Sequence, residues 1–528
     1  MTAKRLISLF LCAILCVTAF SACSKKEEEP ETTADPLKIA YIPLDNRPVN
    51  KERVEFLAQS AGFELLMPEE DLYRTALDNM NKNSDGSTHG NREKLLEWIK
   101  SVEEECDNFV ISLDQMFSGG LVSSRWLSNE DLTLETEIAD YLIELSKDNY
   151  VVYFDTVMRL ASTVGYQGYE LDEYNSFRTY GMAERAELSD DELTVENIIK
   201  GYRYNKNGQE ISSKLSKEQI DKYLAARERK LKVIDRLLSN AVEDIEHIYI
   251  GVDDSSPNSN IQTNEKNYIK KIGGDNLKLF TGADELGLMG IAAVVSKQYG
   301  SADCRVTYYG DGKDKVADEF DSTTLAQTVE NHLTAIGANT NGGDDALQIL
   351  VLTKTSGATF QAKLLIKQLK ENLANGVPTC VINASETTQW GILGEGMLSE
   401  DIEIARLLGY SNWNTVSNAV GISISNAVSR YLYINNAEEV SEKSNEGFLK
   451  TLTFSLVKDL SYRAKGGPEL TFNEKVSYDS PASIAEKINN SEILVKDCET
   501  ASHKAVSLSN FRLPWNRTFE ATFDITVG

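Results

Sequence analysis

The stretch KIAYIPLDNRPVN, residues 38–50, joins a short apolar run to a cluster of polar side chains. The apolar run is too short for a free-standing helix and is punctuated by two prolines, which predicts a buried strand. Asp45, Asn46, Arg47 and Asn50 then follow where this strand ends. Ligands of parallel α/β sheets bind outside the carboxyl ends of the strands, so the stretch predicts both a fold class and the place of a site.

Outward from this stretch, strand-like runs alternate with amphipathic helical runs. The strand-like runs are expected at residues 38–44, 63–67, 108–113, 150–154, 247–252, 277–280, 305–309, 347–353 and 379–382. Such alternation is typical of βαβ units with right-handed crossovers. It predicts an α/β fold with mainly parallel sheets.

A break near residues 300–303 separates six of these runs from three. We therefore expect two doubly wound lobes, residues 37–300 and 301–440, with one enlarged TIM-like barrel as the alternative. From residue 441 to 528 the chain has scattered short alternating runs, which predict a small C-terminal α+β or β appendage.

The N-terminal residues have the pattern of an export signal. Lys4 and Arg5 precede an uncharged, mostly apolar run, and two small residues stand before Cys23. This predicts a lipoprotein signal peptide at residues 1–22 and a lipid on Cys23. Residues 23–36 are charged, contain two prolines and predict a flexible tether. We expect an exported protein, lipid-anchored to the outer face of the cytoplasmic membrane and in contact with that membrane through the lipid only.

The composition excludes several classes of protein. The 528 residues include 54 basic and 81 acidic ones, a net charge of −27 at pH 7 that argues against nucleic acid as a partner. The four cysteines after Cys23 lie far apart, which favours buried free thiols over a disulfide framework. The four histidines occur singly, which argues against a His-rich zinc site and a Ser-His-Asp triad.

Acidic residues recur at the predicted strand ends. The candidate catalytic residues are Asp45, Asp114, Asp253, Asp254, Asp284 and Glu285, and Asp155 ends a further strand just before Arg159. Carboxyl groups at the mouth of a sheet can divide into acid and base, or they can hold a divalent cation through their oxygens. A strand-end Asp is as often a helix N-cap, and this alternative is strongest for Asp284, which opens an apolar helical run.

Two loops supply candidate substrate-binding residues. In SLDQMFSGGLVSSR, residues 112–125, two glycines let a ligand approach the backbone closely. The arginine of this loop can donate two parallel hydrogen bonds to a carboxylate, a phosphate or sugar hydroxyls. The alternative is a tight turn with a surface arginine. In SNWNTVSNAVG, residues 411–421, the Trp ring offers a surface on which a sugar ring stacks, and the Asn side chains offer hydrogen bonds to its hydroxyls. The alternative is that this Asn-rich stretch caps a helix. The candidate substrate-binding residues are Asn46, Arg47, Arg125, Arg159, Asn412, Trp413, Asn414 and Asn418. No G-x-G-x-x-G or Walker-type pattern occurs, so no nucleotide cofactor is indicated.

Six motifs, in order, resemble a known family: IPLDNRPVN, SLDQMFSGGLVSSR, GVDDSSPNS, TGADELG, NWNTVSNAVG and LPWNRTFEATFD. With them the chain resembles the bacterial domain-of-unknown-function family numbered four-one-two-seven across residues 37–528, a family with uncharacterised exported lipoprotein members. Ser411 stands where a Gly often precedes the Asn-Trp pair. The resemblance supports the choice of motifs and implies no particular reaction or substrate.

The leading hypothesis is a surface-anchored hydrolase that acts on a glycan or glycoconjugate through the strand-end carboxylates. The main alternative is a solute-binding lipoprotein without catalysis, whose cleft would use the same Asp, Asn, Arg and Trp contacts. A third hypothesis is a hydrolase that depends on a divalent metal, because oxygen ligands usually hold Ca²⁺, Mg²⁺ or Mn²⁺. The substrate is expected to be a small molecule or a glycan.

Overall fold

The computed structural model describes residues 37–255, 258–316, 323–355, 358–385, 387–462, 480–517 and 520–528. By its internal contacts the chain divides into a short unit, Met1–Leu37, and a large unit, Lys38–Gly528. The predicted signal peptide, tether and lipidation site Cys23 lie outside the described residues. Among the helices that the structure describes, none has the length and apolar character of a membrane span.

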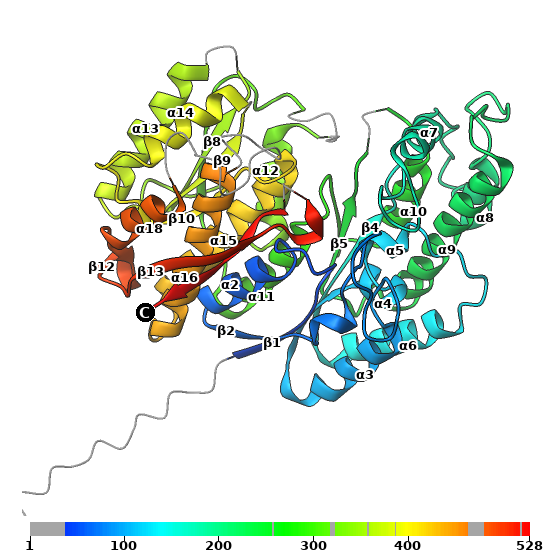
Figure 1. Cartoon of the computed structure of the whole chain (residues 1–528), viewed down its shortest axis with the longest axis horizontal. Helices are drawn as coiled ribbons and strands as arrows, with labels where there is room; N and C mark the ends of the chain where they lie inside the picture. The colour runs from blue at the N-terminus through cyan, green and yellow to red at the C-terminus, as the bar shows by residue number, and fades with distance from the viewer. Residues whose placement is uncertain are drawn as a thin grey trace, which may run out of the picture. The chain divides into compact units, whose positions relative to one another are not determined.

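Six strands form the first sheet, in the order β2-β1-β3-β4-β5-β6 (Figure 1). They are β1 (Leu37–Ile42), β2 (Phe63–Leu66), β3 (Asn108–Ser112), β4 (Tyr150–Val157), β5 (His247–Val252) and β6 (Leu277–Phe280). β1 pairs in parallel with β3, with Tyr41 opposite Val110, and the following pairs as far as β6 are also parallel. The order runs outward from β1 in one direction and from β3 in the other, so the sheet is doubly wound with its switch point between these two strands.

Helices cover both faces of the first sheet, as its near-continuous apolar strands require. Ile39 and Tyr41 of β1 belong to one apolar core, and the alternate residues Ala40 and Ile42 belong to a second one on the other face. The first core includes α2 (Glu52–Ser60) and α11 (Leu286–Tyr299); the second includes α3 (Arg92–Val102), α6 (Thr133–Asp148) and α9 (Lys217–Ala241). The other helices of this half are α4 (Leu113–Ser118), α5 (Leu121–Ser124), α7 (Leu171–Met182), α8 (Val195–Gly201) and α10 (Gln262–Ile272).

Four strands form the second sheet, in the order β10-β9-β8-β7, and all of their pairs are parallel. They are β7 (Cys304–Tyr309), β8 (Leu347–Thr353), β9 (Thr379–Ala384) and β10 (Leu407–Ser411), and the helices are α12 (Leu325–Ala335), α13 (Ala358–Ala374), α14 (Thr387–Met397) and α15 (Val416–Asn436). The sequence pattern predicts the first three strands and misses β10. Its sequence, LLGYS, is short and includes a glycine, which weakens the pattern of a strand.

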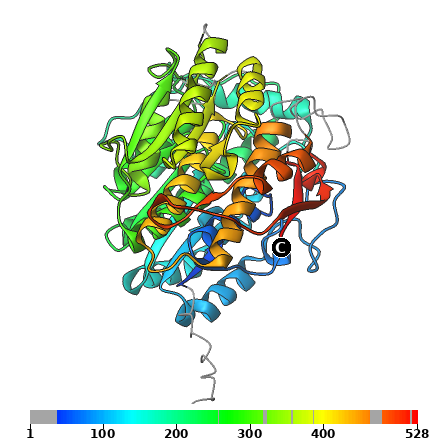
Figure 2. The ribbon, with the colours of Figure 1, turned by 90° about the vertical axis from the view of Figure 1, so that its left-hand side faces the viewer.

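The helices α11 and α15 pack against each other and connect the two sheets (Figures 1 and 2). α11 contacts β3, β4 and β5, and α15 contacts β9 and β10. Both helices are buried along most of their length, as helices in the middle of a core must be. One apolar core, which includes Val110 of β3 and Leu350 of β8, therefore extends across both sheets.

The C-terminal part contains helices and two antiparallel strand pairs. Its helices are α16 (Glu442–Phe454), the π-helical η4 (Ser455–Tyr462) and α18 (Pro481–Asn489); its pairs are β11 (Ile493–Leu494) with β12 (Thr500–Ala501), and β13 (Val506–Arg512) with β14 (Thr522–Val527). In the described part of the chain the short 3₁₀ helices are η1 (Glu70–Leu72), η2 (Glu103–Glu105), η3 (Ile404–Arg406), η6 (Lys496–Cys498) and η7 (Pro514–Asn516). α16 packs on α2 and β14, which brings the last strands near the first helix.

The predicted α/β class with mainly parallel sheets is confirmed. The described strands lie in two open parallel sheets and two short antiparallel pairs, and no closed barrel occurs among them. The lobe boundaries at residues 37–300, 301–440 and 441–528 stay predictions.

Candidate functional site

Acidic residues gather at the carboxyl ends of the first sheet, beside the switch point between β1 and β3. Asp45, Asp114, Asp253 and Asp284 follow β1, β3, β5 and β6, respectively, and Asp155 lies inside β4, two residues before its end. Each of them contacts a basic side chain, and together they form three ion-pair networks.

The first network is centred on Arg47, which bridges two carboxylates. Its Nε donates to Oδ2 of Asp45 at 2.9 Å, and its Nη1 donates to Oδ2 of Asp284 at 3.2 Å. Asn50 Nδ2 donates to Oδ1 of Asp45 at 2.9 Å, and the N–H of Asp284 donates to Oδ1 of Asn418 at 3.3 Å. The guanidinium thus fixes one carboxylate from its own loop and a second from the loop after β6.

The two carboxyl groups of this network differ in exposure. The side chain of Asp45 is fully buried, whereas that of Asp284 is 9% exposed. Burial raises the pKa of Asp284 to about 6, assisted by the negative charge of Asp45 and opposed by Arg47. A carboxyl group with such a pKa can hold a proton near neutral pH.

The second network is centred on Lys230 of α9, which contacts both Asp114 and Asp155. The Ser112 hydroxyl caps α4 by accepting the N–H of Gln115 at 3.2 Å, which places Asp114 in the first turn of that helix. Asp114 Oδ2 also accepts the Thr156 hydroxyl at 2.7 Å. Burial, with the charge of Asp114, raises the pKa of Asp155 to about 7 against the opposing effect of Lys230.

The third network joins arginines to the two acidic residues after β5. Arg125 pairs with Asp253, and Arg159 pairs with Asp254. Arg178 also pairs with Asp254, at 3.2 Å. Burial opposes the ionisation of Asp254, but the two arginines keep its pKa below the usual value. Asp253, with 18% of its side chain exposed, is the most accessible carboxylate of the three networks.

The C-terminal segment completes the first network. The ring of Trp515 lies 5.1 Å from the Arg47 guanidinium, and its Nε1 donates to Oδ1 of Asn46 at 3.1 Å. Glu520 Oε1 lies 3.3 Å from Nη1 of Arg47. Burial lowers the pKa of Arg517, and so do the nearby positive charges of Arg47, Arg159 and Arg125. Residues almost 500 positions apart in the sequence therefore share one site.

Glu285 lies apart from these networks, in a buried polar group between α11, α12 and α15. Its Oε1 accepts the Ser417 hydroxyl at 3.0 Å, and the same oxygen lies 3.5 Å from His332 Nε2. His332 Nδ1 lies 2.7 Å from the carbonyl oxygen of Thr328. All three side chains are essentially inaccessible, so this group has the geometry of a packing contact between helices.

The predicted residues around Trp413 lie in the second half of the chain. Trp413 is 1% exposed, and the Lys458 ammonium lies 5.1 Å from its ring. Asn412 is buried, and Asn414 has a left-handed backbone with φ of 60°. Asn418 reaches the first network through its contact with Asp284. The ligand roles of Asn412, Trp413 and Asn414 stay predictions.

Sequence reasoning omitted several side chains of these networks. Asp155 is a strand-end residue that was not included among the catalytic candidates, whereas Lys230 lies in a charged helix with no distinguishing pattern. Trp515, Arg517 and Glu520 belong to the motif LPWNRTFEATFD. That motif supports the family resemblance only, and nothing in it shows that these residues lie beside Arg47.

A search of the described residues for metal-binding geometry finds no group of three or more His, Cys, Asp or Glu side chains that could hold an ion. A family model described as protein of unknown function (DUF4127) matches residues 39–524. The chain belongs to this family. The three networks of this DUF4127 protein all lie within the matched residues. Neither the curated proteins nor the solved structures compared with it include a match.

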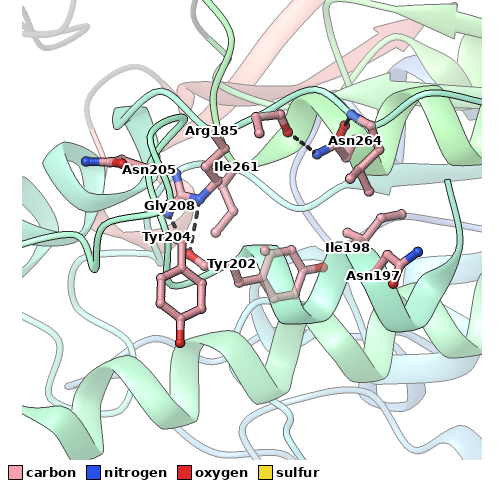
Figure 3. Close-up of a pocket in the computed structure, with 12 residues that line it drawn as sticks. Arg185, Asn197, Ile198, Tyr202, Tyr204, Asn205, Gly208, Ile261 and Asn264 are labelled. Carbon is pink, nitrogen blue, oxygen red and sulfur yellow. Dashed lines mark hydrogen bonds between the residues drawn. The ribbon is translucent and has the colours of Figure 1, made fainter. Parts of the chain in front are cut away.

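A cavity of about 340 Å³ in the DUF4127 protein lies between α8, α10 and the loop around Gly208 (Figure 3). Its polar side chains are occupied by local contacts. Arg185 donates to backbone carbonyl groups, among them that of Tyr202, and Asn264 Nδ2 donates to the carbonyl of Ala186.

Proposed function

We propose that the protein is a surface-anchored lipoprotein hydrolase that acts on a glycan or glycoconjugate at the carboxyl ends of the first sheet. One observation carries this proposal: two pairs of carboxyl groups each share a single cation. Asp45 and Asp284 share Arg47, and Asp114 and Asp155 share Lys230.

In each pair, one member has a raised pKa. Burial is the main cause for Asp284, with a pKa of about 6, and for Asp155, with a pKa of about 7. Neighbouring carboxyl groups whose environments favour different protonation states can divide the roles of acid and base. Hydrolysis of a glycosidic bond uses two carboxyl groups in this way.

We assign the proton donor to Asp284 and the base or nucleophile to Asp253. Asp284 combines a raised pKa with a partly exposed side chain, and Asp253 is the most accessible carboxylate of the three networks. Arg125 and Arg159 flank Asp253 and can bind hydroxyl or anionic groups of a substrate.

The test is a mass-resolved incubation of the protein with a panel of cell-wall and host glycans, comparing wild type with Asp284→Asn and Asp253→Asn. Each variant is nearly isosteric and should release new fragments at least ~100-fold more slowly than wild type, the usual loss for an acid or base. Asp275→Asn, an exposed Asp outside the three networks, is the matched control and should retain full activity. Equal fragment release by all four proteins would remove both assignments. Loss of activity on chelation would instead favour the metal-dependent alternative.

A solute-binding protein without catalysis is the second candidate. It is favoured by the pairing of both acidic residues after β5 with arginines, since such pairs can serve as ligand contacts without any chemistry. The same incubation separates the two functions. A binding protein would retain one glycan unchanged, in the wild type and in both Asp variants.

A further inference from the structure

A small second cavity, of about 50 Å³, adjoins the third network. Its floor consists of buried residues, namely Arg125, Ser162, Tyr169, Phe177 and Tyr223, and its rim consists of Trp126, Glu173, Gln219 and Lys222. A single water needs about 10 to 15 Å³ of such space, so the cavity is large enough for a compact group of several atoms.

Two side chains that line this cavity, Arg125 and Ser162, have buried hydrogen-bonding atoms without a partner in the described part of the chain. Arg125 donates through Nη1 to the Thr163 hydroxyl at 2.7 Å and through Nη2 to Asp253, but its Nε has no hydrogen-bond partner in the described part of the chain. The Ser162 hydroxyl, 3% exposed, has none there either. A buried guanidinium N–H without a partner is costly, which points to a ligand that accepts from it.

The rim adds a second positive charge and an aromatic wall. The ammonium of Lys222, an exposed residue of α9, lies 3.5 Å from the centre of the Trp126 ring. Among the described residues, no carboxylate lies within ion-pair distance of Lys222. Glu173 is the acidic residue of the rim, and its Oε1 accepts Gln219 Nε2 at 2.5 Å.

We infer that this cavity is a subsite for a carboxylate carried by the substrate, so that the glycan contains an acidic sugar such as a uronic acid. This inference rests on the proposed function for the nature of the substrate, but the subsite itself is a matter of binding. The carboxylate accepts from Nε of Arg125 and from the Ser162 hydroxyl, while Lys222 adds its charge from the rim. The ring of the acidic sugar then extends from the cavity toward Asp253, which pairs with Nη2 of the same Arg125 guanidinium.

Calorimetric titration tests this subsite with three probes: a disaccharide ending in glucuronate, the same disaccharide ending in glucose, and the glucose form with a 6-O-sulfate. The glucuronate probe should bind wild type at least ~10-fold more tightly than the neutral one, since charge-assisted hydrogen bonds discriminate by that amount or more. Equal binding of the acidic and neutral probes, or no binding of either, would overturn the subsite. Tighter binding of the sulfate probe would overturn the choice of carboxylate.

Variants locate the binding. Lys222→Met and Ser162→Ala should each weaken binding of the glucuronate probe several-fold and leave the neutral probe unaffected, and neither removes a partner of a buried charge. Glu173→Gln should strengthen binding of the acidic probe, because it removes a repulsive charge from the rim. Lys217→Met, on the same helix and away from the cavity, is the control and should change nothing.

The two proposals can fail separately. If the glucuronate probe binds as described while no glucuronate-containing glycan is cleaved, the subsite stands and the hydrolase proposal falls. If neutral glycans are cleaved and acidic ones are not preferred, the hydrolase proposal stands and the carboxylate subsite falls. Unchanged binding of the acidic probe in both Lys222→Met and Glu173→Gln would also refute the assignment to this cavity.

Discussion

Replacement of Asp155 by Asn should change how the stability of the protein depends on pH. Burial and Asp114 raise the pKa of Asp155 from 3.8 to about 7. Between these two values the folded state holds a proton that the unfolded state has lost, so the carboxyl group destabilises the protein progressively as the pH rises. The slope is about 1.4 kcal/mol per pH unit well below pH 7 and falls to about half of that at pH 7, so a rise from pH 5.5 to pH 8 costs about 2 kcal/mol of unfolding free energy.

The Asn side chain resembles the protonated carboxyl group in shape and does not titrate. Relative to wild type, Asp155→Asn should therefore gain about 2 kcal/mol between pH 5.5 and pH 8, while Lys230 keeps its pair with Asp114. Urea unfolding at pH 5.5, 6.2, 7 and 8, followed by tryptophan fluorescence, measures this difference above the isoelectric point of about 4.7. Parallel pH profiles for the two proteins would refute the reasoning, and so would a growing disadvantage of the variant at high pH.

Two further stability predictions follow from buried contacts near the site. Arg227→Met removes the buried partner of Glu265 and the donor to the backbone carbonyl groups of Met158 and Arg159, so it should lower the unfolding free energy by about 3 to 5 kcal/mol. Arg203→Met breaks the more exposed pair with Asp221 and should cost less than about 1 kcal/mol; equal losses would contradict the role of burial. Trp515→Ala should cost about 3 to 5 kcal/mol by removing a buried ring from the cluster with Leu77, Val122 and Tyr166. Phe360, which is 65% exposed, supplies the aromatic control: Phe360→Ala should leave the unfolding free energy nearly unchanged. Thermal or urea unfolding of all these variants measures the differences.

The fold was largely predictable because the strands are short apolar runs with buried faces. The runs at residues 247–252, 277–280 and 347–353 coincide with β5, β6 and β8. Sheet order was not predictable, because βαβ alternation does not determine on which side of β1 the next strand pairs. The junction of the two sheets was also hidden. It depends on α11 packing against α15, and two helices buried on most sides carry no pattern that identifies their partners.

The candidate site was predictable only in its strand-end part. Asp45, Arg47 and Asp284 follow strands, and parallel topology requires such residues to meet at one edge of the sheet. Lys230 comes from the middle of a 25-residue helix, where its neighbours are also charged, so only the folded structure reveals that it faces Asp114. The burial of Trp413 was not predictable either: its ring is 1% exposed and lies beside Lys458, and its role as a sugar platform stays a prediction.

The charge balance around Arg47 explains why a proton belongs at this site. In the described part of the chain, the carboxylates in contact with Arg47 are Asp45, Asp284 and Glu520, and Lys458 lies 3.9 Å from Glu520. Three carboxylates thus contact the single positive charge of Arg47 in a buried setting, where an uncompensated charge is expensive. Protonation of one carboxyl group reduces the repulsion among the three, and Asp284, the most exposed of them, is the one with the raised pKa. Glu520 comes from the C-terminal segment, and its negative charge helps to raise the pKa of Asp284. The protonation of Asp284 therefore depends on residues near the C-terminus of the chain.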